Sequence, residues 1–315
     1  MRHHYLVLFA SLICLPLPSR TAAQRFLKHN LLLRPPFPVE RPFSSDARNS
    51  IIPSLHTGQT LTYNISGHLV RLIKTESRVA TFEGPKELNG SISGRIVLTI
   101  KEVRPGSPRP LLAVQAKLFS GTETSNSPAP PASYLLTFNL LENGDFDNLE
   151  GFDALSPELR LLWQFWQARF SYPWTIPTSG VKPGAKWRSE ELERNPSLIA
   201  ALSWEKQTTY VRNTPCPFSP QETCAILITQ SKLKQNSSTE DSTPDEYKIR
   251  ELKTNGTAIG TNEVISYVSL SSGLLQRASE DVKQSMDVTV MKRDGSNGVH
   301  YEINASSNFE IRLVP

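Results

Sequence analysis

The sequence predicts a mainly β (α+β) protein: a large curved antiparallel sheet or half-barrel with one apolar helix on its concave face. Between residues 51 and 315, many short runs rich in β-branched and aromatic residues are separated by clusters of Gly, Pro, Asn and Ser. One segment, at about 156–171, instead has apolar residues at helical spacing. Because so apolar a helix has to be covered, and strands make up most of the remaining chain, we expect the helix to pack on the sheet.

The first 23 residues have the composition of an export signal. Arg2 gives a basic start, Tyr5 to Leu17 is almost unbroken apolar sequence, and Thr21-Ala22-Ala23 places small residues at the expected cleavage position. The apolar run is short for a bilayer span, so cleavage near Ala23 is favoured over a retained anchor. We therefore expect a periplasmic or secreted protein with no transmembrane segment in its mature chain.

Residues 24–50 read as a Pro-rich flexible leader. Pro35, Pro36, Pro38 and Pro42 fall in this stretch, and no apolar period is sustained through it. The rest of the chain, 51–315, is predicted to form a single antiparallel β domain.

The strands fall into two series on either side of the helix. In the first series Leu61, Tyr63 and Ile65 alternate with polar residues, the mark of a strand with one buried face. The second series starts at Gly184, includes a predicted strand at 246–252, and reaches residue 314. Its turns are short, so neighbouring strands have to be antiparallel, because parallel neighbours need a long crossover.

The helix has clear start and stop signals. Ser156 is a suitable N-cap, Pro157 suits the first helical position, and Glu158 complements the positive helix start. Tyr172 precedes Pro173, which favours an end to the helix there.

All five tryptophans lie between residues 156 and 204. With Phe170 they could line a groove for an acyl chain, a peptide or a carbohydrate, or they could form the core between helix and sheet, which is the commoner use of aromatic residues. Trp174 follows Pro173 in a loop and is the best candidate for an exposed ring. The predicted ligand-binding residues are Trp163, Trp166, Phe170, Trp174 and Trp187.

Two cysteines remain after residue 23, Cys216 and Cys224, on either side of a Pro-containing loop. In an oxidising compartment a disulfide between them is the favoured interpretation. Such a bond should contribute roughly 2.5 kcal/mol through the entropy of the unfolded chain. Zinc binding would need further Cys or His residues nearby.

The acidic run at 142–153 contains the weak metal candidates Asp145 and Asp147. Alternating carboxylates could bind calcium, but the spacing matches no complete calcium loop, and Asn143-Gly144 is equally a hairpin turn. A carboxylate pair for glycoside hydrolysis also fits the residue types. No nucleophile elbow, HExxH motif or phosphate loop is present. The sequence therefore favours a protein that is not an enzyme and has no cofactor.

Charge argues against a nucleic-acid partner. Removing residues 1–23 takes away Arg2 and Arg20, which lowers Lys+Arg from 34 to 32 against 30 Asp+Glu, a net charge of +2. Proteins that bind nucleic acid normally carry a basic face.

The order of these features is similar to a known pattern: an export signal, many antiparallel strands, one helix before a Pro-rich turn, a strand starting Gly184 to Trp187, and the pair EVISYVSLSSGLLQRASED. It resembles secreted bacterial β-rich domains of unknown function and, more distantly, the half-barrel of the lipoprotein carrier LolA and its receptor LolB. The resemblance implies a lipid or apolar ligand, or an envelope protein partner, in the concavity of the sheet. The alternatives are a structural envelope protein whose helix fills its own core, and a hydrolase with dispersed carboxylates.

Overall fold

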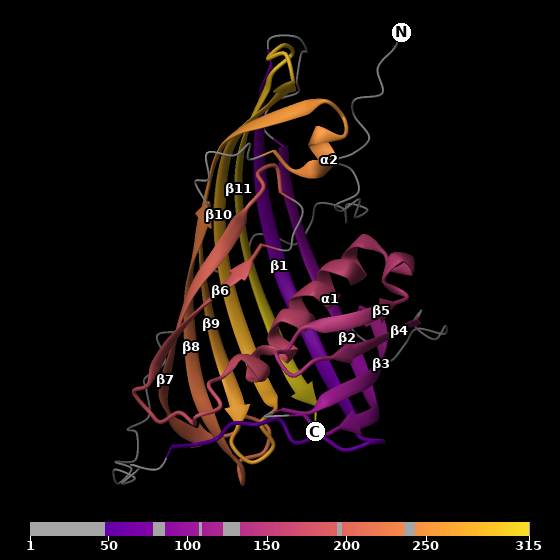
Figure 1. Cartoon of the computed structure of the whole chain (residues 1–315), viewed down its shortest axis with the longest axis vertical. Coiled ribbons are helices and arrows are strands. Elements are labelled where there is room, and N and C mark those ends of the chain that lie inside the picture. The colour runs from indigo at the N-terminus through magenta and orange to yellow at the C-terminus, as the bar shows by residue number, and fades with distance from the viewer. Residues whose placement is uncertain are drawn as a thin grey trace, which may run out of the picture.

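The computed structural model describes residues 48–77, 86–106, 109–121, 133–193, 197–235 and 243–314. The predicted signal peptide, and the leader up to residue 47, lie outside these ranges. The described chain forms one antiparallel sheet of eleven strands, with α1 as its long helix (Figure 1). This arrangement confirms the predicted fold class.

The sheet is built from two meanders joined at its centre. The strands are β1 Thr60–Ser77, β2 Lys86–Arg104, β3 Leu111–Ser120, β4 Ser133–Leu140, β5 Phe146–Glu150, β6 Lys186–Leu192, β7 Leu202–Pro215, β8 Thr223–Gln235, β9 Leu252–Ser269, β10 Leu275–Lys292 and β11 Val299–Val314. Their spatial order is β5-β4-β3-β2-β1-β11-β10-β9-β8-β7-β6. The first and last strands therefore pair with each other, and β5 and β6 form the two edges.

Alternation along β1 defines the two faces of the sheet. Leu61, Tyr63 and Ile65 are buried toward α1, whereas Asn64 and Ser66 are exposed on the opposite side. We call the first side the inner face and the second the outer face. Because pairing is in register, each inward residue of β1 continues across the sheet as a row of inward residues.

The helix α1 runs over Pro157–Phe170, with Ser156 as its N-cap accepting a hydrogen bond from the Leu159 backbone N–H. Gly94 on β2 permits its close approach, because a Cβ there would overlap the side chain of Leu162. After α1 a short 3₁₀ turn, η2 Tyr172–Thr175, leads away toward β6. A second 3₁₀ turn, η1 Phe152–Ala154, precedes α1.

Residues 48–59 close the lower end of the inner face. Asn49 bridges Val181, the Ser54 backbone N–H donates to the Ser272 carbonyl at 2.8 Å, and Ile51 is fully buried in the core. In Figure 1 this segment passes beneath the lower ends of the strands.

Two local expectations have clear outcomes. Cys216 and Cys224 form a disulfide, as predicted. The predicted strand at 246–252 is wrong over most of its length: α2, Asp245–Lys248, forms there, and β9 begins only at Leu252. Pro244 precedes the helix and Asp245 and Glu246 occupy its first turn, a helix start signal that outweighs the short β-like pattern.

Candidate functional site

The inner face divides into two halves because the strands are much longer than the helix. The central strands β1, β9 and β10 each have 18 residues, about 59 Å of extended chain. The 14 residues of α1 span only about 21 Å. In Figure 1 α1 crosses the lower part of the sheet, and α2 lies near its upper end. We call the half under α1 the lower inner face and the half beyond it the upper inner face.

Aromatic rings fill the lower inner face. Trp163 and Trp166 are 0% exposed, with ring centroids 4.8 Å apart. Trp166 stacks on Phe170 at 4.7 Å, and Phe138 of β4 meets Trp163 edge-on at 5.3 Å. These three predicted ligand-binding residues are therefore core residues that pack against the sheet.

The other two predicted aromatic residues lie at the margins of the same core. Trp174, expected to be exposed, is 1% exposed, because η2 turns the chain back and places its ring 5.6 Å from Phe170. Trp187 on β6 is half-buried and packs against the core from the edge strand. The structure thus brings Trp163, Trp166 and Trp174 into one cluster, with Trp187 at its border.

The indole N–H groups of that cluster are unusual. In the described part of the chain, Nε1 of Trp163, Trp166 and Trp174 is buried without a hydrogen-bond partner. Other aromatic rings pack against these three indoles, and aromatic faces accept N–H groups only weakly. The rings therefore contribute through packing.

A polar cluster marks the boundary between the two halves. Arg169, near the end of α1, forms a two-pronged ion pair with Glu280, an inward residue of β10, with Nε to Oε2 at 3.1 Å. Asn262 of β9 also donates to Glu280 Oε1, at 2.6 Å. Both charged side chains are buried, so this pair fixes the C-terminal end of α1 on the sheet.

Hydroxyl groups extend this boundary toward β7 and β8. The Tyr172 hydroxyl lies 3.4 Å from Thr208 Oγ1 and 3.3 Å from Thr229 Oγ1, and burial raises the pKa of Tyr172. The next inward pair along β8 and β9 is Ser231 and Asn262. The buried Ser231 Oγ and Asn262 Oδ1 have no partner among the described residues. Unpaired buried polar atoms are uncommon and call for a water or ligand atom.

The upper inner face is apolar but only partly covered. A second core cluster covers its β7–β10 side; it includes Leu198, Ile199, Trp204 and Leu233 together with Ala258 of β9 and Val288 of β10. On the β1, β2, β10 and β11 side, the inward apolar side chains remain half-exposed. These are Leu69, Ile73 and Leu88, together with Val282, Met286, Tyr301 and Ile303, which pack against the second cluster, and Ile92, which packs against the lower core.

Arg71 lies in the middle of this apolar surface. It points inward from β1 between Leu69 and Ile73, and its register partners are Leu88 on β2 and Ala305 on β11. Its Nε is buried without a partner within the described residues, and burial lowers the pKa of Arg71. The sequence analysis did not single out this residue. Its signal was a cation at a position where the alternation of the strand predicts an inward, apolar side chain.

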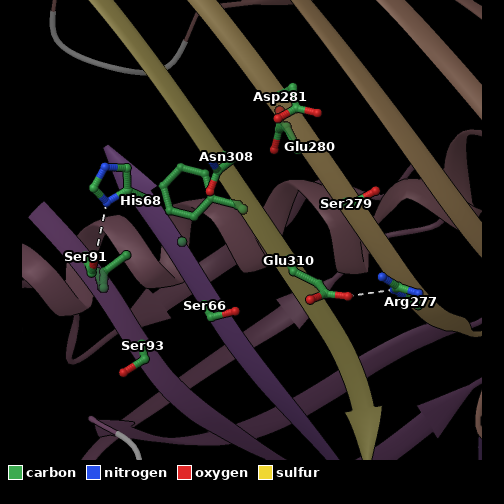
Figure 2. A pocket seen from close by; sticks show the side chains of 13 residues that line it. Ser66, His68, Ser91, Ser93, Arg277, Ser279, Glu280, Asp281, Asn308 and Glu310 are labelled. Carbon is green, nitrogen blue, oxygen red and sulfur yellow. Dashed lines mark hydrogen bonds and ion pairs between the residues drawn. The ribbon is translucent and has the colours of Figure 1, made fainter. Parts of the chain in front are cut away.

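Two depressions on the outer face are lined by described residues. The larger, about 540 Å³, is lined by Ser66, His68, Ser91, Ser93, Arg277 and Glu310 among others. Figure 2 views it with α1 behind the strands: His68 Nδ1 lies 3.2 Å from Ser91 Oγ, and Arg277 Nε donates to Glu310 at 2.6 Å. The second, about 510 Å³, lies above it around Val70, Leu72 and Ile259.

The outer depressions offer little for chemistry. A Ser–His pair needs a group that orients the imidazole, and the hydrogen bond described for His68 is the one to Ser91. In Figure 2 Asp281 lies on β10, beyond Asn308 from His68. Arg277 and Arg312 both bind Glu310, so this carboxylate is engaged by two cations.

Asp145 directly follows the hairpin turn between β4 and β5, and Asp147 lies in β5, where it pairs with Asn139 of β4. Asn143 Nδ2 donates to Asp145 Oδ2 at 2.7 Å, and Asp147 Oδ1 accepts from the Asn148 backbone N–H at 2.9 Å. Both carboxylates are exposed. Within the described ranges, no group of three or more His, Cys, Asp or Glu side chains is placed to hold a metal ion.

Comparisons with known proteins add little to this picture. No protein-family model and no curated protein matches the chain. Among solved structures, the outer membrane protein OprG from Pseudomonas aeruginosa matches at 6% identity and a TM-score of 0.18, covering 84% of this chain and 99% of that chain. A structure titled "Asymmetric conductivity of engineered proteins" matches at 7% identity and 0.18, covering 81% and 99%. Scores this low carry no structural argument.

The helices of the described residues are all too short or too polar to cross a membrane.

Proposed function

We propose that this chain is an extracytoplasmic, non-enzymatic protein that binds an apolar, acyl-chain ligand on its upper inner face. The observation that carries the proposal is the incompletely covered apolar surface beyond the end of α1, formed by β1, β2, β10 and β11 beside the second core cluster. A folded protein normally buries such a surface against its own chain or against a ligand. The helix is too short to cover it.

The shape of this surface favours a long, narrow ligand. The partly exposed inward residues of β1 run from Leu69 to Ile73 over about 13 Å, and Ile73 continues across the sheet as a row with Ile303 and Met286, at the border of the second core cluster. An extended acyl chain fits a surface of these proportions, and its burial there is favourable in proportion to the apolar area removed from water.

An extracytoplasmic location is supported by the disulfide between Cys216 and Cys224, because such bonds persist in oxidising compartments. The export-signal composition of residues 1–23 points the same way. The proposed ligand also agrees with the lipid carriage that the LolA resemblance implies. An envelope protein partner that docks an apolar segment on the same surface is the alternative occupant.

The test uses two neighbouring positions on β1 that face opposite sides. Ile73→Glu places a charge on the upper inner face, and Leu72→Glu places the same charge on the outer face. We expect a fluorescent long-chain fatty acyl probe to bind the wild type and Leu72→Glu, and to bind Ile73→Glu at least about tenfold more weakly, because the new charge would have to be desolvated. Equal binding by the two variants would show that the ligand does not bind on the inner face.

The filled aromatic core of the lower inner face supports a second reading, a structural envelope protein whose core is complete without a ligand. If the wild type binds no acyl probe, that reading is favoured.

A further inference from the structure

Arg71 differs from Arg169, Arg277 and Arg312 in that it has no counter-charge among the described residues. Arg169 pairs with Glu280, and Arg277 and Arg312 share Glu310. Within the described residues, Arg71 makes no hydrogen bond or ion pair, and its Nε is sealed from water. A guanidinium does not escape this situation by losing its proton, since it stays charged in proteins.

The described parts of the five strands around Arg71 offer it no free carboxylate. Among the described residues of β1, β2, β9, β10 and β11, Glu280 is the one acidic residue at an inward register position. That carboxylate already accepts from Arg169 and Asn262. It also lies four residues along β10 from Gln284, the residue in the Arg71 row.

The surroundings of Arg71 are those of a partly buried apolar site. Leu69 and Ile73 flank it along the strand, and Leu88 lies opposite on β2. On the other side the inward residues of β11 in the same and the adjacent row are Ala305 and Ser307, which are small and cover little of the guanidinium. A cation in apolar surroundings is costly unless an anion joins it.

We infer that Arg71 binds the anionic head of the ligand, so that the ligand is an anionic amphiphile such as a long-chain carboxylate. This inference rests on the proposed function. A planar guanidinium binds a carboxylate or phosphate through two parallel N–H···O bonds, and the apolar side chains on both sides of Arg71 along β1 accept the attached chain. The upper inner face thus selects its ligand by charge as well as by apolar area.

The experiment compares oleic acid, oleyl phosphate and methyl oleate, which share one chain and differ in the head group. The variant is Arg71→Met, which keeps length and removes the charge. The control is Lys283→Met, which removes the same charge from an exposed outer-face position on β10. Binding of each ligand is measured by calorimetry on the full chain.

We expect the wild type and Lys283→Met to bind an anionic ligand at least about tenfold more tightly than the methyl ester, since charged hydrogen bonds are the stronger class. Which anion binds better identifies carboxylate or phosphate as the natural head. Arg71→Met should lose this preference while it still binds the ester, and its thermal midpoint should not fall, because an unpaired charge has been removed.

The outcomes separate the two proposals. If the wild type binds acid and ester equally, or if Arg71→Met retains the preference, the head-group site at Arg71 is wrong and acyl-chain binding stands. If the wild type binds none of the three ligands, the proposed function is wrong and the Arg71 site with it.

Discussion

The two halves of the inner face use the same sheet in opposite ways. On the lower inner face, α1 supplies aromatic side chains that leave no room between helix and strands, and Trp163 and Trp166 are fully buried. On the upper inner face the same strands continue with aliphatic residues such as Ile73 and Ile303, which remain half-exposed. The first half is a complete core and the second is an apolar surface without a full cover. A single antiparallel sheet can therefore carry a filled core at one end and leave an incompletely covered apolar surface at the other.

The largest expected effect is on the filled half. Trp163→Ala should lower the free energy of unfolding by about 3–5 kcal/mol, because a fully buried indole leaves a large cavity. Urea denaturation gives this value directly. Trp187→Ala, at the half-buried margin of the same core, is the matched control and should cost clearly less. Equal losses at the two positions would contradict the picture of a filled lower half.

The boundary between the halves should give the next largest effect. Glu280→Gln leaves Arg169 buried without its counter-charge and should cost about 3 kcal/mol. Glu310→Gln removes a carboxylate that binds Arg277 and Arg312 on the outer face, where solvent screens the pairs, and should cost under about 1 kcal/mol. The double variant Arg169→Met/Glu280→Leu should recover much of the Glu280→Gln loss in denaturant unfolding, and a failure to do so would mean that the pair has a role beyond mutual neutralisation.

The smallest effect is expected on the open half. Ile303→Ala should cost about 1 kcal/mol, since a half-exposed side chain loses only part of its transfer free energy. Ile311→Ala, on the same strand but fully buried, provides the comparison and should cost at least twice as much. If thermal and denaturant unfolding show the two changes to be equal, the upper inner face is as well covered as the lower.

Much of the fold was readable from local patterns. The alternation of Leu61, Tyr63 and Ile65 predicted the inner face of β1, and Ser156 with Pro157 predicted the start of α1. Cys216 and Cys224 were paired correctly because two cysteines on either side of one short loop leave few alternatives. These features depend on neighbours in the chain, which the sequence displays directly.

The site was harder to predict because its parts come from distant segments. Arg169 and Glu280 are 111 residues apart, and their pairing depends on where α1 ends over β10. Trp174 follows a proline in an apparent loop, yet η2 returns it to the core. Arg71 was overlooked because its isolation is a property of the whole inner face, which becomes visible only once the register of five strands is known.

The pairing of β1 with β11 has a consequence for how the molecule assembles. Each meander can form from sequential hairpins, but the seam between them joins residues such as Tyr63 and Leu313, which are 250 positions apart. Until the last strand docks, the β1 and β10 ladders each present an unsatisfied edge, a template for pairing with another chain. Because such distant contacts form slowly, this molecule should be most vulnerable to aggregation just before its final strand closes the seam.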